Sequence, residues 1–134
     1  MSVDHSVLIP GQQVSNQTYL LDEKTVSRFE DAVGDRTRLR FKANARALVP
    51  PMAVAALSLR GVVEDLDIPG GTLHAGQEIE FTRAISIGEN LRCSATLLQN
   101  SVRGDWRFVV VQLQVEDSGG SRVMNGKSTI MLQA

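Results

Sequence analysis

Apolar residues recur at helical spacing in a first stretch of the chain. Val26 and Phe29 repeat at this spacing after Asp22, a residue that can cap a helix. Gly34 follows where a C-terminal cap belongs. The pattern predicts a short amphipathic helix from about Glu23 to Val33.

A second helix is predicted after two prolines. Pro50 and Pro51 end any preceding helix and suit the first turn of a new one. From Met52 to Leu66 the early positions are nearly all apolar, and charged side chains appear only toward the end. A helix without a polar face is buried on most of its sides. Since its alanines and Gly61 permit close approach of another backbone, we expect a sheet wrapped around this helix.

The rest of the chain is predicted to form strands separated by short turns. The segment up to about Thr18 is predicted to be an arm or an edge strand. After Pro69, a run of four strands predicts an antiparallel meander that follows the buried helix, within one domain of residues 1–134. The expected strands are Thr72–Ile87, Leu91–Gln99, Trp106–Val115 and Arg122–Gln133.

Apolar and polar residues alternate in the first of these strands, which predicts one buried face and one solvent-exposed face. His74 lies with acidic side chains on the solvent-exposed face, which favours a surface or interface histidine over a catalytic one. A bulge after Gly71 would reverse that orientation. The expected buried face comprises Leu73, Ala75, Ile79 and Phe81, and the expected solvent-exposed face comprises His74, Glu78 and Glu80.

Composition narrows the class of protein. The 134 residues are 43% hydrophobic and 22% charged, which is typical of one soluble domain. Fourteen Lys plus Arg against fifteen Asp plus Glu leave a net charge of −1, so we expect neither nucleic acid nor a membrane as partner. Cys93 is the only cysteine, and we expect it in the core rather than as a nucleophile. A reducing, cytoplasmic location fits, since no signal peptide or membrane span is evident.

Four blocks of the sequence resemble the MaoC-like acyl-thioester dehydratases and hydratases. The resemblance implies an α+β hot-dog fold, in which a long antiparallel sheet wraps a central buried helix. It also implies acyl thioesters of coenzyme A or an acyl carrier as ligands, no separate cofactor or metal, and dimers with sites between the subunits. Ala84 departs from the pattern, which usually has proline there. The blocks are RFEDAVGD at Arg28–Asp35, LVPPM at Leu48–Met52, GGTLHAGQEIEF at Gly70–Phe81 and TRAISIGENL at Thr82–Leu91.

The family's catalytic pair is incomplete in this sequence. Hydration of an α,β-unsaturated thioester needs a base for water, an acid for the α-carbon and donors for the enolate oxygen. The family supplies base and acid as an Asp and, five positions later, a His. Asp35 is in place, although a turn residue is an equal alternative for it, whereas Arg40 stands where the His belongs. Arginine stays protonated, so it cannot exchange a proton with water or substrate.

Three functions therefore remain open. The favoured one is a non-catalytic subunit that pairs with a second hot-dog chain, with Arg40 binding a coenzyme A phosphate or a carboxylate. The second is an active hydratase or dehydratase, a lyase, in which His74 replaces the missing proton carrier beside Asp35. The third is a thioesterase or a non-enzymatic acyl-CoA-binding protein.

Substrate contacts are predicted at the start of the second helix. The backbone amides of Met52, Ala53 and Val54 lie at its N-terminal end, where a helix offers unpaired donors and a positive dipole to a thioester carbonyl. The alternative is that these amides meet water or a neighbouring loop. Upstream, basic residues alternate as on one strand face, which is either solvated or in contact with phosphate: Arg36, Arg38, Arg40, Lys42 and Arg46.

Overall fold

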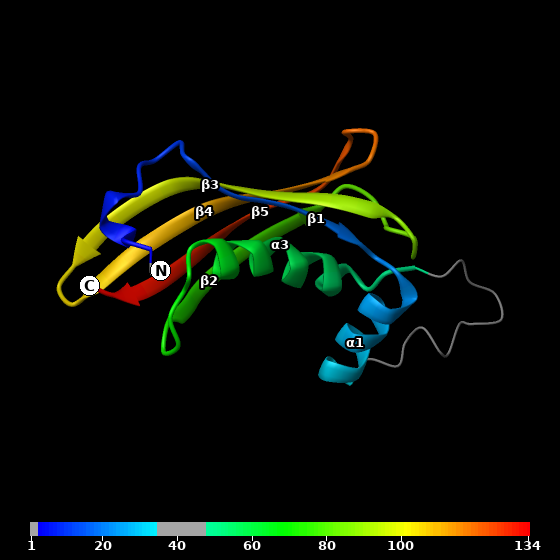
Figure 1. The fold of residues 1–134 in the computed structure, drawn as a ribbon, viewed down its shortest axis with the longest axis horizontal. Helices are drawn as coiled ribbons and strands as arrows, with labels where there is room; N and C mark the ends of the chain where they lie inside the picture. The colour runs from blue at the N-terminus through cyan, green and yellow to red at the C-terminus, as the bar shows by residue number, and fades with distance from the viewer. Residues whose placement is uncertain (1–2, 35–47) are drawn as a thin grey trace.

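A curved sheet forms the larger layer of the molecule. The computed structural model describes residues 3–34 and 48–134. Within this part of the chain, five strands form one antiparallel sheet in the order β1-β3-β4-β5-β2 (Figure 1). The strands are β1 (Gln13–Leu20), β2 (Leu73–Phe81), β3 (Asn90–Arg103), β4 (Trp106–Asp117) and β5 (Arg122–Gln133).

Helix α3 (Pro51–Asp65) runs along the concave side of this sheet (Figure 1). It packs on β1, where the Ser15 hydroxyl donates to the Asp65 carboxylate over 2.8 Å. A side chain at Gly61 would place its Cβ 2.6 Å from the Ser15 hydroxyl, so a glycine at this point lets helix and strand approach closely. The sheet wrapped around an apolar helix confirms the expected hot-dog arrangement.

Helix α1 (Glu23–Val33) has the bounds that the sequence predicts. The Asp22 carboxylate accepts from the Thr25 amide over 2.8 Å, which satisfies a free donor of the first turn. Gly34 ends the helix at a φ of 71°, in the left-handed region that glycine adopts without strain. Val26 is fully buried, so the amphipathic helix packs its apolar face on the rest of the molecule.

The predicted meander is wrong in one connection. Strand β2 pairs with β5 at the edge of the sheet and not with β3, which follows it in sequence. The expected strand Thr72–Ile87 ends at Phe81, because the chain then leaves the sheet and buries Ile85 to 3% exposure. The Val49 amide donates to the Ile85 carbonyl over 2.8 Å, which fixes this crossing segment at the start of α3.

The N-terminal edge strand is confirmed as β1, which pairs with β3. Before it, a short 3-10 helix (His5–Val7) is held to the sheet, since the Asn100 side chain donates to the His5 carbonyl over 2.8 Å. No helix in residues 3–34 and 48–134 is long and apolar enough to cross a membrane.

Candidate functional site

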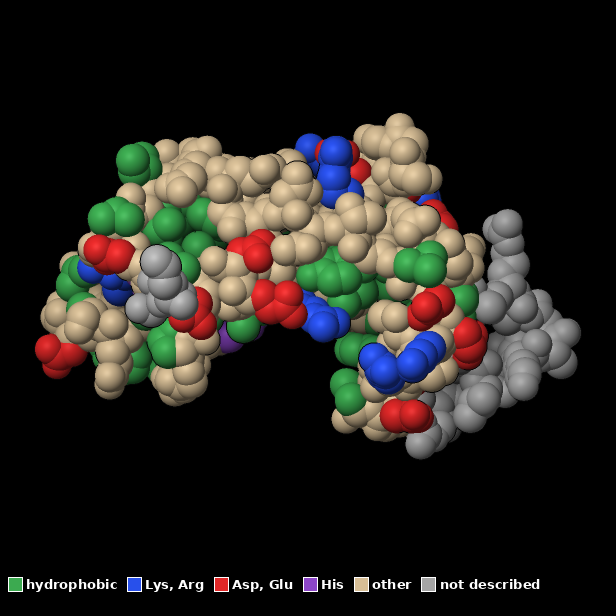
Figure 2. All heavy atoms as spheres, in the orientation of Figure 1, with side chains coloured by type: hydrophobic (Ala, Val, Ile, Leu, Met, Phe, Trp, Pro, Cys, Tyr) green, Lys and Arg blue, Asp and Glu red, His purple; other side chains and the backbone are tan. Residues whose placement is uncertain are grey.

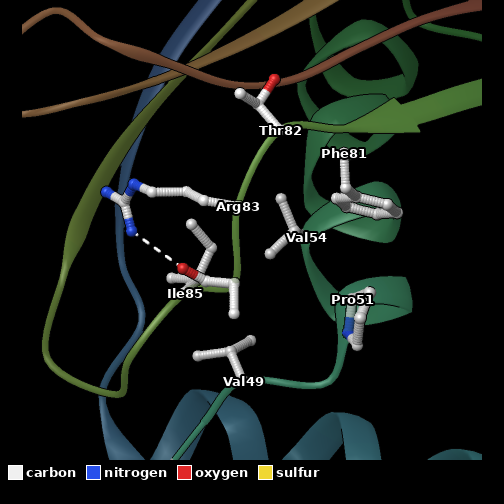
Figure 3. A pocket seen from close by; sticks show the side chains of 8 residues that line it. Val49, Pro51, Val54, Phe81, Thr82, Arg83 and Ile85 are labelled. Atoms are coloured by element: carbon white, nitrogen blue, oxygen red, sulfur yellow. Dashed lines mark hydrogen bonds between the residues drawn. The ribbon is translucent and has the colours of Figure 1, made fainter.

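A largely apolar pocket of about 230 Å³ opens at the N-terminal end of α3. Val49, Pro51 and Val54 approach it from the segment that enters the helix (Figure 3). Phe81 and Ile85 approach from the end of β2 and the crossing segment. The pocket can therefore hold a small apolar group beside the first amides of the helix.

Ion pairs hold the crossing segment in place. Arg83 reaches the Glu89 carboxylate over 2.7 Å and the Asp117 carboxylate over 2.9 Å. Its guanidinium lowers the pKa of both carboxyls, because it binds their charged forms. In Figure 3 the Arg83 side chain points away from the apolar side chains and donates to the Ala84 carbonyl over 2.9 Å. Arg83 thus shapes the wall of the pocket and leaves its interior apolar.

The helix amides that we expect to hold a carbonyl are not equivalent. The Ala53 amide donates to the Pro50 carbonyl over 2.9 Å, so it is already paired. For the Val54 amide the i−4 carbonyl is that of Pro50, the N-cap, and the Val54 side chain lines the pocket. Met52 is 55% exposed, and its amide precedes these bonded positions. Pro51 has no amide hydrogen, which leaves the Met52 amide as the donor nearest the helix end.

His74 lies on a different face from the one the alternation predicts. It pairs with Ile130, which is 3% exposed, and the register shifts by one residue between His74 and Gly76. Residues directly opposite in an antiparallel pair share a face, so His74 faces the side of the sheet on which α3 lies. Glu78 pairs with the exposed Lys127 on the other face. The expectation that His74 shares a face with Glu78 is therefore wrong, and a bulge at Ala75 is the reason.

The same bulge corrects the predicted buried face of this strand. Leu73 pairs with Met131 on the convex side and is 50% exposed, and Ala75 is the extra residue. Ile79 and Phe81 keep the predicted orientation, because they pair with Gly126 and with the fully buried Met124.

Asp35 and Arg40, together with the other basic residues of segment 35–47, lie outside the described residues. The group Arg83, Glu89 and Asp117 was not predicted from the sequence. Asp117 lies far from the other two along the chain, and no local spacing pattern connects it to Arg83.

Cys93 is a core residue, as the sequence predicts. It is 4% exposed and pairs with Val115 in the neighbouring strand. Burial raises the pKa of its thiol to about 12, so it carries no thiolate at neutral pH. The position does not fit a cysteine nucleophile.

A second pocket of about 230 Å³ lies between α1 and α3. Arg28 and Arg60 line it together with Phe29 and Leu57. Arg60 already bonds Glu64 one turn further along α3, over 2.9 Å. The amides at the helix start border the first pocket, so we treat that one as the candidate site.

The sheet wrapped on one helix, with a pocket at the helix start, defines a hot-dog protein, and solved structures share this fold. The R-hydratase PhaJ1 of Pseudomonas aeruginosa aligns with a TM-score of 0.81 at 22% identity, over 98% of this chain and 86% of that one. The MaoC-like dehydratase of Rhodospirillum rubrum aligns with 0.74 at 18%, over 96% and 94%. The HadBC 3R-hydroxyacyl-ACP dehydratase complex of Mycobacterium tuberculosis aligns with 0.69 at 15%, over 91% and 99%.

A family model described as the FAS1-like dehydratase domain region matches residues 9–126. The chain therefore belongs to this family of hot-dog dehydratase domains, which confirms the resemblance to MaoC-like dehydratases and hydratases. A search of the curated proteins finds no match.

Proposed function

We propose that this chain binds an acyl thioester of coenzyme A or an acyl carrier, with the acyl group in the pocket at the start of α3. The observation that carries this proposal is the apolar lining of that pocket beside the exposed N-terminal turn of α3. An apolar cavity of about 150 Å³ holds a six-carbon ring, so a pocket of 230 Å³ suits a short acyl chain. The Met52 amide then donates to the thioester carbonyl.

The reaction that this arrangement supports is hydration of an enoyl thioester or the reverse dehydration. Asp35 and His74 are the proposed proton carriers, and Arg40 is the proposed contact for a phosphate of the carrier. The donor at the helix start stabilises the enolate oxygen, where negative charge develops. Membership of a dehydratase family supports this chemistry. The proposed substrates are acyl chains of the fatty-acid type, and the proposed location is the cytoplasm.

A non-catalytic subunit is the second candidate function. It is favoured by Arg40, which cannot carry a proton to or from water at working pH. The HadBC dehydratase is a complex, which supports pairing between hot-dog chains of this kind. In that case the pocket binds acyl thioester while the partner carries out the proton transfers.

The deciding experiment is hydration of crotonyl-CoA and longer enoyl-CoAs by the purified protein, followed at the absorbance of the conjugated thioester. If the protein is a hydratase, it turns over alone, and Asp35→Asn or His74→Ala lowers kcat/KM by about 10²- to 10⁴-fold. Asp105→Asn, in an exposed turn, is the matched control and leaves kcat/KM unchanged.

Binding separates the two functions where turnover is absent. Tight binding of acyl-CoA without turnover supports the subunit function, and failure to bind any acyl thioester refutes both. Ala84→Trp fills the mouth of the pocket and should abolish binding, because Ala84 is an exposed lining residue. Ala134→Trp, at the exposed C-terminus, is the control of equal size and should bind as the wild type does.

A further inference from the structure

The crevice between α1 and α3, with a volume of about 230 Å³, has two helix faces as its walls. The lining positions of α3 recur three or four residues apart, which is the spacing of one face of a helix. They are Ala53, Ala56, Leu57 and Arg60. Among the described residues, none lines both this crevice and the pocket at the start of α3. The crevice is therefore a separate cavity, on another side of the same helix.

The floor of the crevice is apolar. Leu21 and Val26 are fully buried, and Leu57 is also buried. Phe29 is partly buried and packs against the core. Figure 2 shows the surface hollowed beside α1, with apolar side chains along the wall of the hollow. Since an apolar cavity of about 150 Å³ holds a six-carbon ring, the crevice has room for a tail of about six carbons.

Two arginines lie at the mouth of the crevice. Arg28 and Arg60 are both exposed, and no acidic side chain lines the crevice among the described residues. A guanidinium stays protonated at any working pH, so both side chains keep their charge. Asp22 caps α1 six residues before Arg28, so it attracts Arg28 from about 9 Å along the helix axis. Glu64 bonds Arg60 and offsets one of the two positive charges, which leaves one for a ligand.

Arg60 is held in a position that suits an anion. Its Nε donates to the Glu64 carboxylate over 2.9 Å, and its guanidinium carbon lies 6.0 Å from the centre of the Tyr19 ring. The bond to Glu64 uses Nε and leaves the two Nη groups, whose fork matches the two oxygens of a carboxylate. Because the side chain is already ordered by Glu64 and Tyr19, it loses little conformational freedom when an anion binds.

We propose that the crevice between α1 and α3 binds a monocarboxylate with a short apolar tail. The tail lies on the apolar floor, and the carboxylate lies between Arg28 and Arg60. A single negative charge matches the positive charge that remains at the mouth, whereas a phosphate monoester carries about two negative charges near pH 7. The inference goes beyond the acyl-thioester function, because the ligand is a free acid and the crevice is separate from the pocket at the start of α3.

Titration of isotope-labelled protein with sodium hexanoate, followed by NMR, tests the site directly. The amide signals of Phe29 and Leu57 should shift and saturate, because both residues line the crevice. Hexanol carries a similar tail without the charge and should bind about tenfold more weakly or worse, since hydrogen bonds to charged groups contribute most. Shifts confined to Ala84 and Ile85 in the other pocket, equal affinity for hexanol, or no saturable shift overturns the proposal.

Substitution of the arginines tests the contact with the carboxylate. Arg60→Gln and Arg28→Gln should each raise the Kd for hexanoate about tenfold or more, because each removes a charged donor. Arg92→Gln is the matched control. Arg92 is also an exposed arginine with a carboxylate partner, Glu116, but it lies on β3, so its loss should leave the Kd unchanged. An unchanged Kd in both crevice variants overturns the proposal.

Filling each cavity in turn locates the acid. Ala56 is an exposed lining residue of the crevice, so Ala56→Trp should abolish hexanoate binding without disturbing the core. Ala84→Trp fills the pocket at the start of α3 and should leave hexanoate binding intact. The reverse pattern overturns the proposal. A protein that binds hexanoate but neither binds an acyl thioester nor hydrates enoyl-CoA loses the proposed function and keeps this inference, so the two failures are distinguishable.

Discussion

Strands β4 and β2 belong to the same sheet but bury their side chains very differently. In β4, Val109, Val111, Leu113 and Val115 are all fully buried. In β2 every residue is exposed or only partly buried, and Leu73 is half exposed. β4 has a strand on each side and helix α3 against its concave face, whereas within residues 3–34 and 48–134 β2 pairs with β5 alone. β4 also has apolar residues at every one of these buried positions, whereas β2 has His74 and Gln77 on the same side of the sheet.

The contrast separates folding from function in this molecule. The free energy of folding comes mainly from the covered centre of the sheet, because the hydrophobic effect scales with the apolar area removed from water. The uncovered edge contributes little to the isolated chain and is free to bind. We therefore expect substitutions in β4 to lower stability more than substitutions in β2.

The largest expected effect is loss of packing in β4. Leu113→Ala removes a fully buried side chain and should lower the free energy of unfolding by about 2–5 kcal/mol. Leu73→Ala is the matched change in β2 and should cost less than about 0.5 kcal/mol, since its side chain is half exposed. Urea denaturation of both variants measures the two values. Similar losses would show that β2 is as well covered as β4.

A pair of glycines tests the boundary between the two regions. A Cβ at Gly126 in β5 would lie 2.5 Å from the Glu78 carbonyl oxygen, so Gly126→Ala should push β2 away and cost about 1–3 kcal/mol. A Cβ at Gly76 in β2 meets nothing within 4 Å, and Gly76→Ala should change stability by less than about 0.5 kcal/mol. Thermal unfolding followed by circular dichroism compares them. The reverse order would contradict the pairing of β2 with β5.

The segment after β2 is joined to the end of β4 through Arg83. Arg83→Gln removes its bonds to Glu89 and Asp117 and should lower Tm by about 2–4 °C at pH 7. Arg83 lowers the pKa of both carboxyls below their ordinary values of 4.5 and 3.8. Their stabilisation is therefore present above those values and is lost as pH falls through the lowered pKa values of the folded state.

Melting curves of wild type and Arg83→Gln between pH 7 and about pH 2 test this sign. The two Tm values should converge as the pH falls below about 4, and high salt should reduce the difference at pH 7. A Tm difference that grows toward acid would contradict the lowered pKa values. Arg122→Gln, an exposed arginine at the start of β5, is the control.

The sequence predicts the elements in which regularly spaced apolar residues bury one face. The caps at Asp22 and Gly34 mark helix α1 to the residue, and the apolar run after Pro51 marks helix α3. The expected strand Trp106–Val115 lies within β4. These features depend on local residues and on one buried face.

The pairing of β2 and the face of His74 could not be predicted in the same way. Strand order depends on the crossing segment, where Ile85 is buried against the start of α3 and the alternation continues without a break. The face of His74 depends on one extra residue at Ala75, and this bulge is hidden because Leu73, Ala75 and Ile79 keep an even spacing in the sequence. Arg83 bonds Asp117 over a separation that no local spacing reveals.

The smallest expected effect is deletion of Ala75. Because Ala75 is the unpaired residue of the bulge, its removal brings His74 next to Gly76 and leaves His74 opposite Ile130. The free energy of unfolding, measured by urea denaturation, should change by less than about 1 kcal/mol. Deletion of Thr129 in the regular part of β5 is the control, since it shifts every later side chain to the other face and should unfold the edge. If β2 had no bulge, deletion of Ala75 would instead reverse the face of His74 and lower stability as the deletion of Thr129 does.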